Sequence, residues 1–231
     1  MASNDESGDD KEDLIISYLG LRKSVGTIGV LLPIALMIAT ITNADIDLKC
    51  SISHFYYTDA RPIFVGSLMI IGAFLGSYRG YPPQKGEWVS DRQLALTAAL
   101  GAIVTALIPT DNVMPNALHC EATRTAFGWI HLISAALFLS VIGGMTFFKF
   151  SRSDTHRHIY RLCGGIIFAA LGLIGCIMIF NLDTKPWMPH AWLFWLETIA
   201  VWAFGVSWLV KGKLLEDQYG AKVVDWFKTL T

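Results

Sequence analysis

The chain has 231 residues, of which 53% are hydrophobic and 16% are charged. This balance favours a membrane protein over a soluble one. The formal net charge is −1, and the basic residues flank apolar stretches instead of gathering on one face, so we expect no nucleic-acid partner. Six apolar stretches and their loops take up nearly all of the length, which leaves no room for a separate soluble domain.

Residues 1–13 are acidic and polar and contain no aromatic residue. A segment of this composition cannot bury enough apolar surface to offset the entropy of ordering, so we expect it to be disordered. It also lacks the basic start and apolar core of a secretory signal peptide. We therefore expect the folded part of the chain, a transmembrane domain, to cover residues 14–211.

Six stretches of this domain are long and apolar enough to cross a bilayer. A helix rises about 1.5 Å per residue, so about 20 residues cross the roughly 30 Å of hydrocarbon. The predicted spans cover residues 25–41, 62–78, 92–109, 126–148, 159–180 and 191–210. Gly72, Gly76 and Gly80 follow one another at four-residue intervals and predict a face for close helix packing. The predicted fold class is all-α, a polytopic bundle of six transmembrane helices.

The basic residues fall on alternating sides of these spans. Cytoplasmic segments of membrane proteins carry an excess of Lys and Arg. Of the 18 Lys and Arg residues, all but four lie in the N-terminal segment, the second and fourth loops and the C-terminal tail; the exceptions are Lys49, Arg61, Arg124 and Lys185. Both termini are therefore predicted to be cytoplasmic, and the loops after the first, third and fifth spans to face outward.

The outward side gathers the residues that suit ligand binding. His131 and Glu197 lie within two different spans, both about 8–9 Å below the outer surface. An ionised carboxyl group is costly in hydrocarbon, so Glu197 must face the bundle, take up a proton or find a partner such as His131. One interpretation is a polar pocket with His131 and Glu197 on its floor and with His54, Asp59, Arg61 and His119 around its mouth. The alternatives are a hydrogen bond that fixes one helix against another, and an Asp59–Arg61 surface ion pair that caps the second span.

Histidines of the outward side also suggest a metal site. The candidates are His54, His119, His131 and His190. A catalytic zinc ion takes about three protein ligands and keeps a position open for water. The spacing of these histidines matches no diagnostic pattern such as H-E-x-x-H. A zinc site formed by these histidines is therefore an alternative hypothesis, which no sequence motif supports.

Two of the four cysteines lie in outward loops. A disulfide between Cys50 and Cys120 is chemically permitted if that side is oxidising, and it would tie the second span to the fourth. The alternative is two unpaired, partly buried thiols. Cys163 and Cys176 lie in the fifth span, where we expect small core residues.

The C-terminal residues 212–231 alternate apolar and charged side chains. This pattern predicts a cytoplasmic tail that lies at the membrane interface as a helix, broken near Gly220. An ordinary frayed tail is the alternative.

Two runs of the sequence carry a family resemblance. Residues 51–66 read S-I-S-H-F-Y-Y-T-D-A-R-P-I-F-V-G, and residues 197–212 read E-T-I-A-V-W-A-F-G-V-S-W-L-V-K-G. They resemble the signature of a family of uncharacterised six-span bacterial membrane proteins. More distantly, the layout resembles the Frag1/damage-regulated autophagy modulator/Sfk1 group. The resemblance implies a bacterial inner-membrane protein and an association with lipid handling, without one shared reaction or a catalytic residue to carry over.

Three functions fit these observations. The first is a non-enzymatic membrane protein whose outward-facing polar pocket binds a small ligand, an ion or a lipid headgroup. The second is a metal-dependent integral membrane lipid hydrolase, in which outward histidines hold zinc and Glu197 or Asp59 is the base. The third is a structural or assembly partner within the lipid bilayer. Few polar residues continue into the inner half of the spans, which favours a one-sided pocket over a channel or transporter.

Overall fold

The computed structural model of the chain describes residues 3–43, 48–80, 86–112, 125–152, 155–185 and 187–212. Over these residues the fold is all-helical, as the sequence predicts. The long helices are α1 (Ser3–Thr42), α2 (Arg61–Ser77), α3 (Asp91–Leu107), α4 (Ala126–Gly144), α5 (Arg157–Ile179) and α6 (Trp192–Lys211). Shorter elements are the 3-10 helices η1 (Ile52–Tyr57) and η3 (Leu182–Thr184), and the π-helix η2 (Met145–Phe150), which continues α4.

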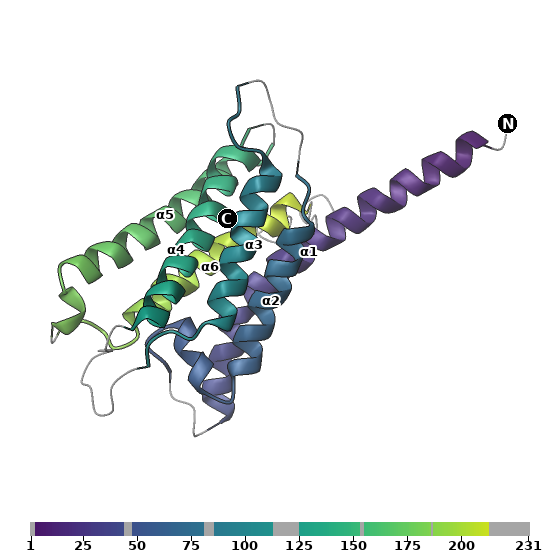
Figure 1. The fold of residues 1–231 in the computed structure, drawn as a ribbon. Coiled ribbons are helices and arrows are strands. Elements are labelled where there is room, and N and C mark those ends of the chain that lie inside the picture. Colours follow the sequence, from purple (N-terminus) through teal and green to yellow (C-terminus); the bar gives the residue numbers. More distant parts are fainter. Residues whose placement is uncertain are drawn as a thin grey trace, which may run out of the picture.

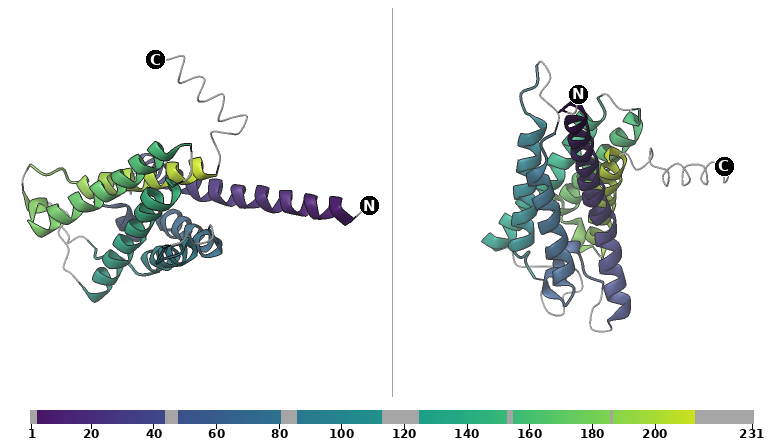
Figure 2. Two further views of the ribbon diagram at one scale, coloured as in Figure 1. Left: turned by 90° about the horizontal axis from the view of Figure 1, so that it is seen from above. Right: turned by 90° about the vertical axis from the view of Figure 1, so that its right-hand side faces the viewer.

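The long helices form one bundle. Helices that follow one another in the sequence pack against each other, and α6 closes the ring by packing against α1 (Figure 1). The first part of α1 extends beyond the bundle, as two further views also show (Figure 2). We call the two ends of the bundle the η1 end, where η1 lies, and the Trp88 end, where the α2–α3 connection lies.

Each predicted span overlaps one of the long helices and extends beyond it by at most two residues, with α4 and η2 together covering the fourth. Within the described residues, four segments are long and apolar enough to cross a membrane, namely Leu19–Thr42, Ala126–Phe150, Arg157–Ile179 and Trp192–Lys211. α2 is also apolar but shorter. These helices make the chain an integral membrane protein, because several apolar helices of this length match the thickness of the hydrocarbon layer of a bilayer.

The helix α1 begins earlier than the sequence suggests. It includes residues 3–13, which we expect to be disordered, in one continuous helix that starts at Ser3. Extending an existing helix costs far less than nucleating one, and no proline precedes Pro33. Residues 213–231 lie outside the described part, so the interfacial tail stays a prediction.

The helices α1 and α6 approach each other backbone to backbone. A Cβ atom on Gly26 would lie 2.7 Å from the carbonyl oxygen of Gly205, and one on Gly205 would lie 2.8 Å from that of Gly26. Small residues allow such an approach, and membrane helices associate through close packing of this kind. Of the glycine face expected on α2, Gly72 packs closely, since a Cβ there would meet the Ile103 side chain of α3 at 2.7 Å, whereas a Cβ on Gly76 would meet no atom closer than 4.0 Å, and Gly80 lies beyond the end of α2.

Aromatic rings fill the bundle toward the Trp88 end. The Trp208 ring packs edge-on against Tyr78, Phe150 and Phe204, with ring centroids 5.2, 5.5 and 6.2 Å away. The Lys211 ammonium lies 5.4 Å and 5.5 Å from the ring centroids of Phe150 and Tyr160. Such edge-on and cation–π contacts stabilise the packing beyond the area they bury. We call Tyr78, Phe150, Tyr160, Phe204 and Trp208 the aromatic cluster.

Candidate functional site

A cavity of about 420 Å³ lies among α4, α5 and α6 at the η1 end. Its volume falls in the range of small-molecule sites, which are mostly apolar with a few convergent polar groups. The apolar wall comes from α4 and α5, with residues such as Leu132 and Ile174. The polar lining comes from both loops and helices: Ser51, Ser53, His54, Thr110, Asp111, His131, Asp183 and Glu197.

The polar side of the cavity is built on η1. Ser51 caps this short helix, because its hydroxyl oxygen accepts a hydrogen bond from the backbone N–H of His54 at 3.2 Å. The same oxygen lies 2.6 Å from Nδ1 of His54. Both side chains are buried. The cap therefore fixes the imidazole of His54 against the cavity.

Glu197 holds η1 against α6. Its Oε2 accepts a hydrogen bond from the backbone N–H of Ile52 at 2.7 Å. One helical turn earlier on α6, the backbone N–H of Phe194 donates to the carbonyl oxygen of Cys50 at 2.8 Å. The rings of Phe55 and Phe194 pack beside these bonds with centroids 6.0 Å apart. The half-buried carboxyl group thus serves as an anchor as well as a lining group.

His131 is bonded to the α3–α4 connection. Its Nδ1 lies 2.6 Å from the carbonyl oxygen of Ile108, and since a carbonyl only accepts, Nδ1 carries the proton. The side chain is 3% exposed, and its Nε2 has no hydrogen-bond partner among the described residues. A neutral imidazole in this tautomer presents a lone pair at Nε2. His131 is therefore an acceptor on the cavity wall.

Asp111 fixes the beginning of α4. Its Oδ1 accepts hydrogen bonds from the backbone N–H of Thr125 at 3.1 Å and from the Thr125 hydroxyl at 2.6 Å. The Thr125 hydroxyl oxygen in turn accepts from the backbone N–H of Gly128 at 3.1 Å. A Cβ atom on Gly128 would collide with the Asp111 carboxylate, so glycine is required there. A negative charge at this position is also favoured by the helix dipole.

Tyr57 joins η1 to the same connection. Its hydroxyl donates a hydrogen bond to the carbonyl oxygen of Thr110 at 2.5 Å. The pKa of the Tyr57 phenol is raised above its ordinary value, first by burial and then by the nearby Asp111 and Tyr56. Hydrogen bonds thus connect the elements around the rim of the cavity in series, from α6 through η1 to the α3–α4 connection and α4.

The structure brings together three of the six side chains predicted to form the pocket. His54, His131 and Glu197 line the cavity, but His131 and Glu197 bond to separate backbone groups and not to each other. Asp59 and Arg61 are exposed, and neither lines the cavity. The Arg61 guanidinium donates to the Tyr56 hydroxyl at 2.5 Å and stacks on that ring, in place of the expected ion pair with Asp59. His119 lies outside the described residues.

Sequence reasoning did not assign Asp111, Asp183 or the two serines Ser51 and Ser53 to the pocket. Asp111 and Asp183 each follow a predicted outward span end by a few residues. That placement is the signal that could have found them, because loop residues next to adjacent helix ends meet in a bundle. Ser51 and Ser53 flank Ile52, whose N–H binds Glu197, so their position depends on a docking contact that no local pattern reveals.

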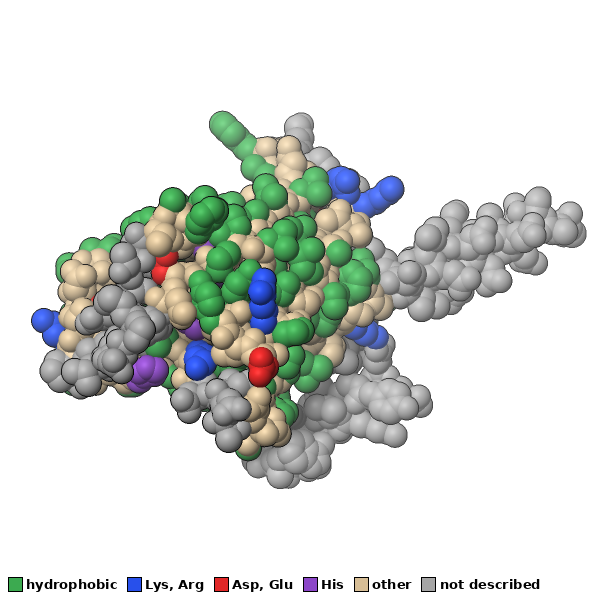
Figure 3. Space-filling model, turned by 60° about the horizontal axis from the view of Figure 1, so that its bottom comes forward, with side chains coloured by type: hydrophobic (Ala, Val, Ile, Leu, Met, Phe, Trp, Pro, Cys, Tyr) green, Lys and Arg blue, Asp and Glu red, His purple; other side chains and the backbone are tan. Residues whose placement is uncertain are grey.

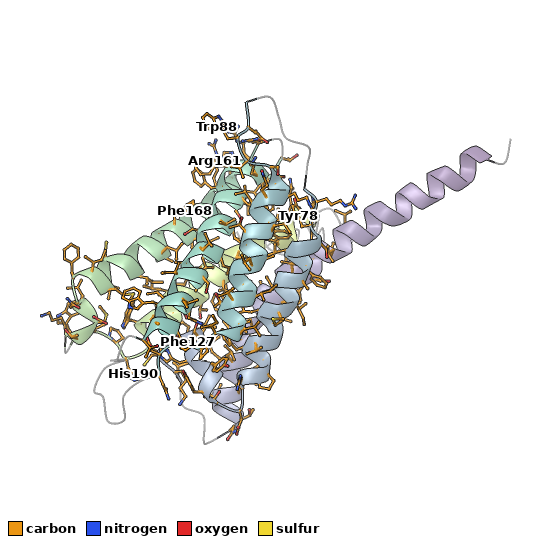
Figure 4. All side chains as sticks on the ribbon, viewed as in Figure 1. Tyr78, Trp88, Phe127, Arg161, Phe168 and His190 are labelled. Carbon is orange, nitrogen blue, oxygen red and sulfur yellow. The ribbon has the colours of Figure 1, made fainter. Side chains whose placement is uncertain are left out.

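The expected metal and disulfide residues are only partly described. No three His, Cys, Asp or Glu side chains of the described ranges converge to hold a metal ion. His190 is exposed at the η1 end, opposite Trp88 and Arg161 (Figure 4), and its Nε2 lies 3.6 Å from Sγ of Cys50. Cys50 is disulfide-bonded, but Cys120 lies outside the described residues, so that pairing stays a prediction.

The two cysteines of α5 differ from each other. Cys163 and Cys176 are both free thiols. Cys163 is buried, as expected for a small core residue, whereas Cys176 is exposed. The expectation for Cys176 is wrong because its side of α5 faces away from the bundle.

No protein-family profile, curated protein or solved structure matches this chain. The fold and the site therefore define the protein by class: an integral membrane protein of packed apolar helices with a part-polar cavity at one end. A view toward the η1 end shows few histidine, acidic and basic side chains, scattered among hydrophobic ones (Figure 3).

Proposed function

We propose that the chain is a six-span membrane protein with both termini in the cytoplasm, whose cavity opens outward and binds a small ligand, an ion or a lipid headgroup. The observation that carries this proposal is the meeting of His54, His131 and Glu197 in one cavity. These side chains come from η1, α4 and α6, and apolar residues of α4 and α5 surround them. Convergent polar groups in an apolar hollow are the usual form of a binding site.

The orientation rests on the distribution of basic residues. Lys149, Arg152 and Arg161 lie toward the Trp88 end, as does Arg92 at the beginning of α3. The positive-inside rule assigns that end to the cytoplasm and the η1 end to the outside. At 17 residues each, α2 and α3 reach the lower limit for a spanning helix. The resemblance of residues 51–66 adds a bacterial inner membrane, and the more distant resemblance of the six-span layout adds a link to lipids.

Binding explains the polar lining better than a reaction does. Three lining groups are tied to backbone groups: Glu197 to Ile52, His131 to Ile108 and Asp111 to Thr125. Groups held in this way are rigid acceptors that orient a ligand. A metal-dependent hydrolase would instead bind zinc through outward histidines, so elemental analysis of the purified protein that found stoichiometric zinc would favour that alternative.

Cysteine accessibility tests the proposal. In a background with Cys50, Cys120, Cys163 and Cys176 replaced by alanine, single cysteines are introduced by Asp183→Cys, Ser140→Cys and Trp88→Cys. A membrane-impermeant thiol reagent should label the first two only from outside and the third only from the cytoplasmic side, since Trp88 is 98% exposed at the opposite end. Labelling of Asp183→Cys and Trp88→Cys from one and the same side would refute the orientation. Failure to label Ser140→Cys would mean that no open cavity reaches α4.

A further inference from the structure

We propose that the cavity binds a single-chain amphiphile with a protonated amine head, which enters sideways from the bilayer between α4 and α5. This inference rests on the pocket function proposed above and names its ligand class. Three properties of the cavity carry it: its elongated shape, the sign of its charges and its vacant acceptors.

The cavity follows two facing helices. Its α4 wall is a stripe at helical spacing that starts at His131 and ends at Ser140, which corresponds to about 13 Å along the axis. The α5 wall is a similar stripe from Leu171 to Met178. Polar groups gather at the η1 end of these stripes, and apolar side chains line most of the remainder. This shape fits a molecule with one polar end and one apolar chain.

The cavity is also open along its side. Toward the η1 end, α5 diverges from α4 while it stays beside α6 (Figures 1 and 2). Ala136 and Ser140 of α4 line the cavity and are nevertheless exposed. Both lie within the apolar segment Ala126–Phe150, so the exposed side of the cavity faces hydrocarbon. A chain can therefore enter from the lipid without passing the polar rim.

The charges of the lining favour a cationic head. The carboxylates of Asp111 and Asp183 line the cavity, and no lysine or arginine of the described residues does. A phosphate or carboxylate head would meet groups of its own sign without a compensating cation, which is costly at low dielectric. An ammonium group carries three donors and no acceptor, and it forms charge-assisted hydrogen bonds to carboxylates.

Two acceptors of the lining have no partner within the described structure. One is Nε2 of His131, on a side chain that is 3% exposed. The other is the half-buried carboxylate of Asp183, for which the described residues provide no hydrogen bond or ion pair. Buried polar atoms are nearly always satisfied, so the unsatisfied Nε2 of His131 indicates a donor supplied from outside the chain, and the half-buried Asp183 carboxylate is a second acceptor that such a donor can reach. An amine head supplies such donors.

Photolabelling of the full chain in phosphatidylcholine nanodiscs tests the inference. The probe is dodecylamine with a photoreactive diazirine in its chain, and mass spectrometry locates the labelled residues. We expect labels on the cavity faces of α4 and α5, and competition by unlabelled dodecylamine but not by dodecyl phosphate. Equal competition by the phosphate, or labels scattered over the lipid-facing surface, would overturn the inference.

A matched pair of variants separates the cavity from the bilayer. Gly175 lines the cavity and Gly172 does not, yet a Cβ added at either position meets no atom within 4 Å. Gly175→Leu should reduce labelling about tenfold by filling the hollow, whereas Gly172→Leu should leave it unchanged. Asp183→Asn, which keeps the shape and removes the charge, should weaken dodecylamine competition about tenfold, as expected for one lost charge-assisted bond. Unchanged labelling in both Gly175→Leu and Asp183→Asn would refute the amine site.

The outcomes for this inference differ from those for the proposed function. If methylammonium, which has no chain, competes as well as dodecylamine, the pocket binds a small cation and only the amphiphile inference fails. If neither the photoprobe nor the thiol reagent reaches the cavity faces of α4 and α5, no open pocket exists and both proposals fail.

Discussion

The two ends of the bundle differ in how the space between the helices is filled. At the Trp88 end, the aromatic cluster fills the space between the helices, and Trp208 is 1% exposed. At the η1 end, α4 and α5 diverge, small residues such as Ala136 and Gly175 face the gap, and a cavity of about 420 Å³ remains. Aromatic rings could fill both ends of the bundle, but they fill only the Trp88 end.

The difference also appears in the polar groups. At the Trp88 end, the charges of Lys211 and Arg22 lie against aromatic rings, within packed protein. At the η1 end, the polar side chains bond to loop backbone on one side and face the cavity on the other. One end therefore stabilises the bundle, whereas the other places functional groups, so substitutions at the first should reduce stability and those at the second should affect binding.

The largest loss of stability should come from removing a side chain of the aromatic cluster at the Trp88 end. Trp208→Ala removes the ring that contacts Tyr78, Phe150 and Phe204, and truncation of a buried aromatic residue costs about 3–5 kcal/mol in well-packed cores. Equilibrium unfolding in detergent measures this loss. Trp195→Ala is the matched control, because Trp195 lies on the same helix but is 44% exposed. A similar cost for both variants would show that the aromatic cluster is no special source of stability.

A smaller loss should follow from separating α1 and α6. In Gly205→Ala the new methyl group would lie 2.8 Å from the Gly26 carbonyl oxygen, and backbone cannot rotate away as a side chain can. Overpacking of this kind typically costs about 1–3 kcal/mol. The melting temperature should fall, whereas Gly172→Ala, with no atom within 4 Å of the new methyl group, should keep or raise it. Equal behaviour of the two variants would contradict the close approach.

These contrasts show what the sequence predicts well. Apolar length places the helices of the bundle, because membrane spans must satisfy their backbone hydrogen bonds within one helix, but it does not reveal that α1 begins at Ser3. The depth of His131 and Glu197 follows from the same counting, which is why they line a common cavity. Asp59 and Arg61 do not line the cavity, because charge and loop position do not reveal the direction of a side chain, and Arg61 turns to Tyr56.

Other features of the site depend on long-range docking and have no local signal. The Ile52–Glu197 bond joins residues 145 positions apart. It fixes η1 on α6 and thereby brings Ser51 and Ser53 to the cavity. The sequence offered His131 as the natural partner of Glu197, but a backbone N–H satisfies that carboxyl group instead. A loop folded over a helix end can supply such donors at positions that no helical periodicity marks.

The hydrogen bond between Ile52 and Glu197 gives a prediction at the η1 end. Glu197→Ala removes the acceptor of the Ile52 N–H, and an unsatisfied buried donor costs about 1–3 kcal/mol. Glu197→Gln keeps a carbonyl oxygen at that position and should retain most of the stability. Unfolding experiments and hydrogen exchange of the Ile52 amide measure the two effects. If glutamine destabilises as much as alanine, the hydrogen bond is not what holds η1 against α6.

The smallest expected effect is a pH dependence at the cavity rim. Burial, Asp111 and Tyr56 raise the pKa of Tyr57 above its ordinary value of 10.0, so the folded chain holds this proton more tightly than the unfolded chain does. The resulting stability is present below the unfolded pKa and is lost as the pH rises through the higher folded pKa, where the phenolate no longer donates to Thr110. Above about pH 10 the wild-type chain should therefore lose slightly more stability than Tyr57→Phe. Because Tyr57 is 44% exposed, the difference should be small, and ultraviolet titration of the phenolate locates the transition. Identical stability curves for the two chains at alkaline pH would show that this hydroxyl does not hold η1 to the α3–α4 connection.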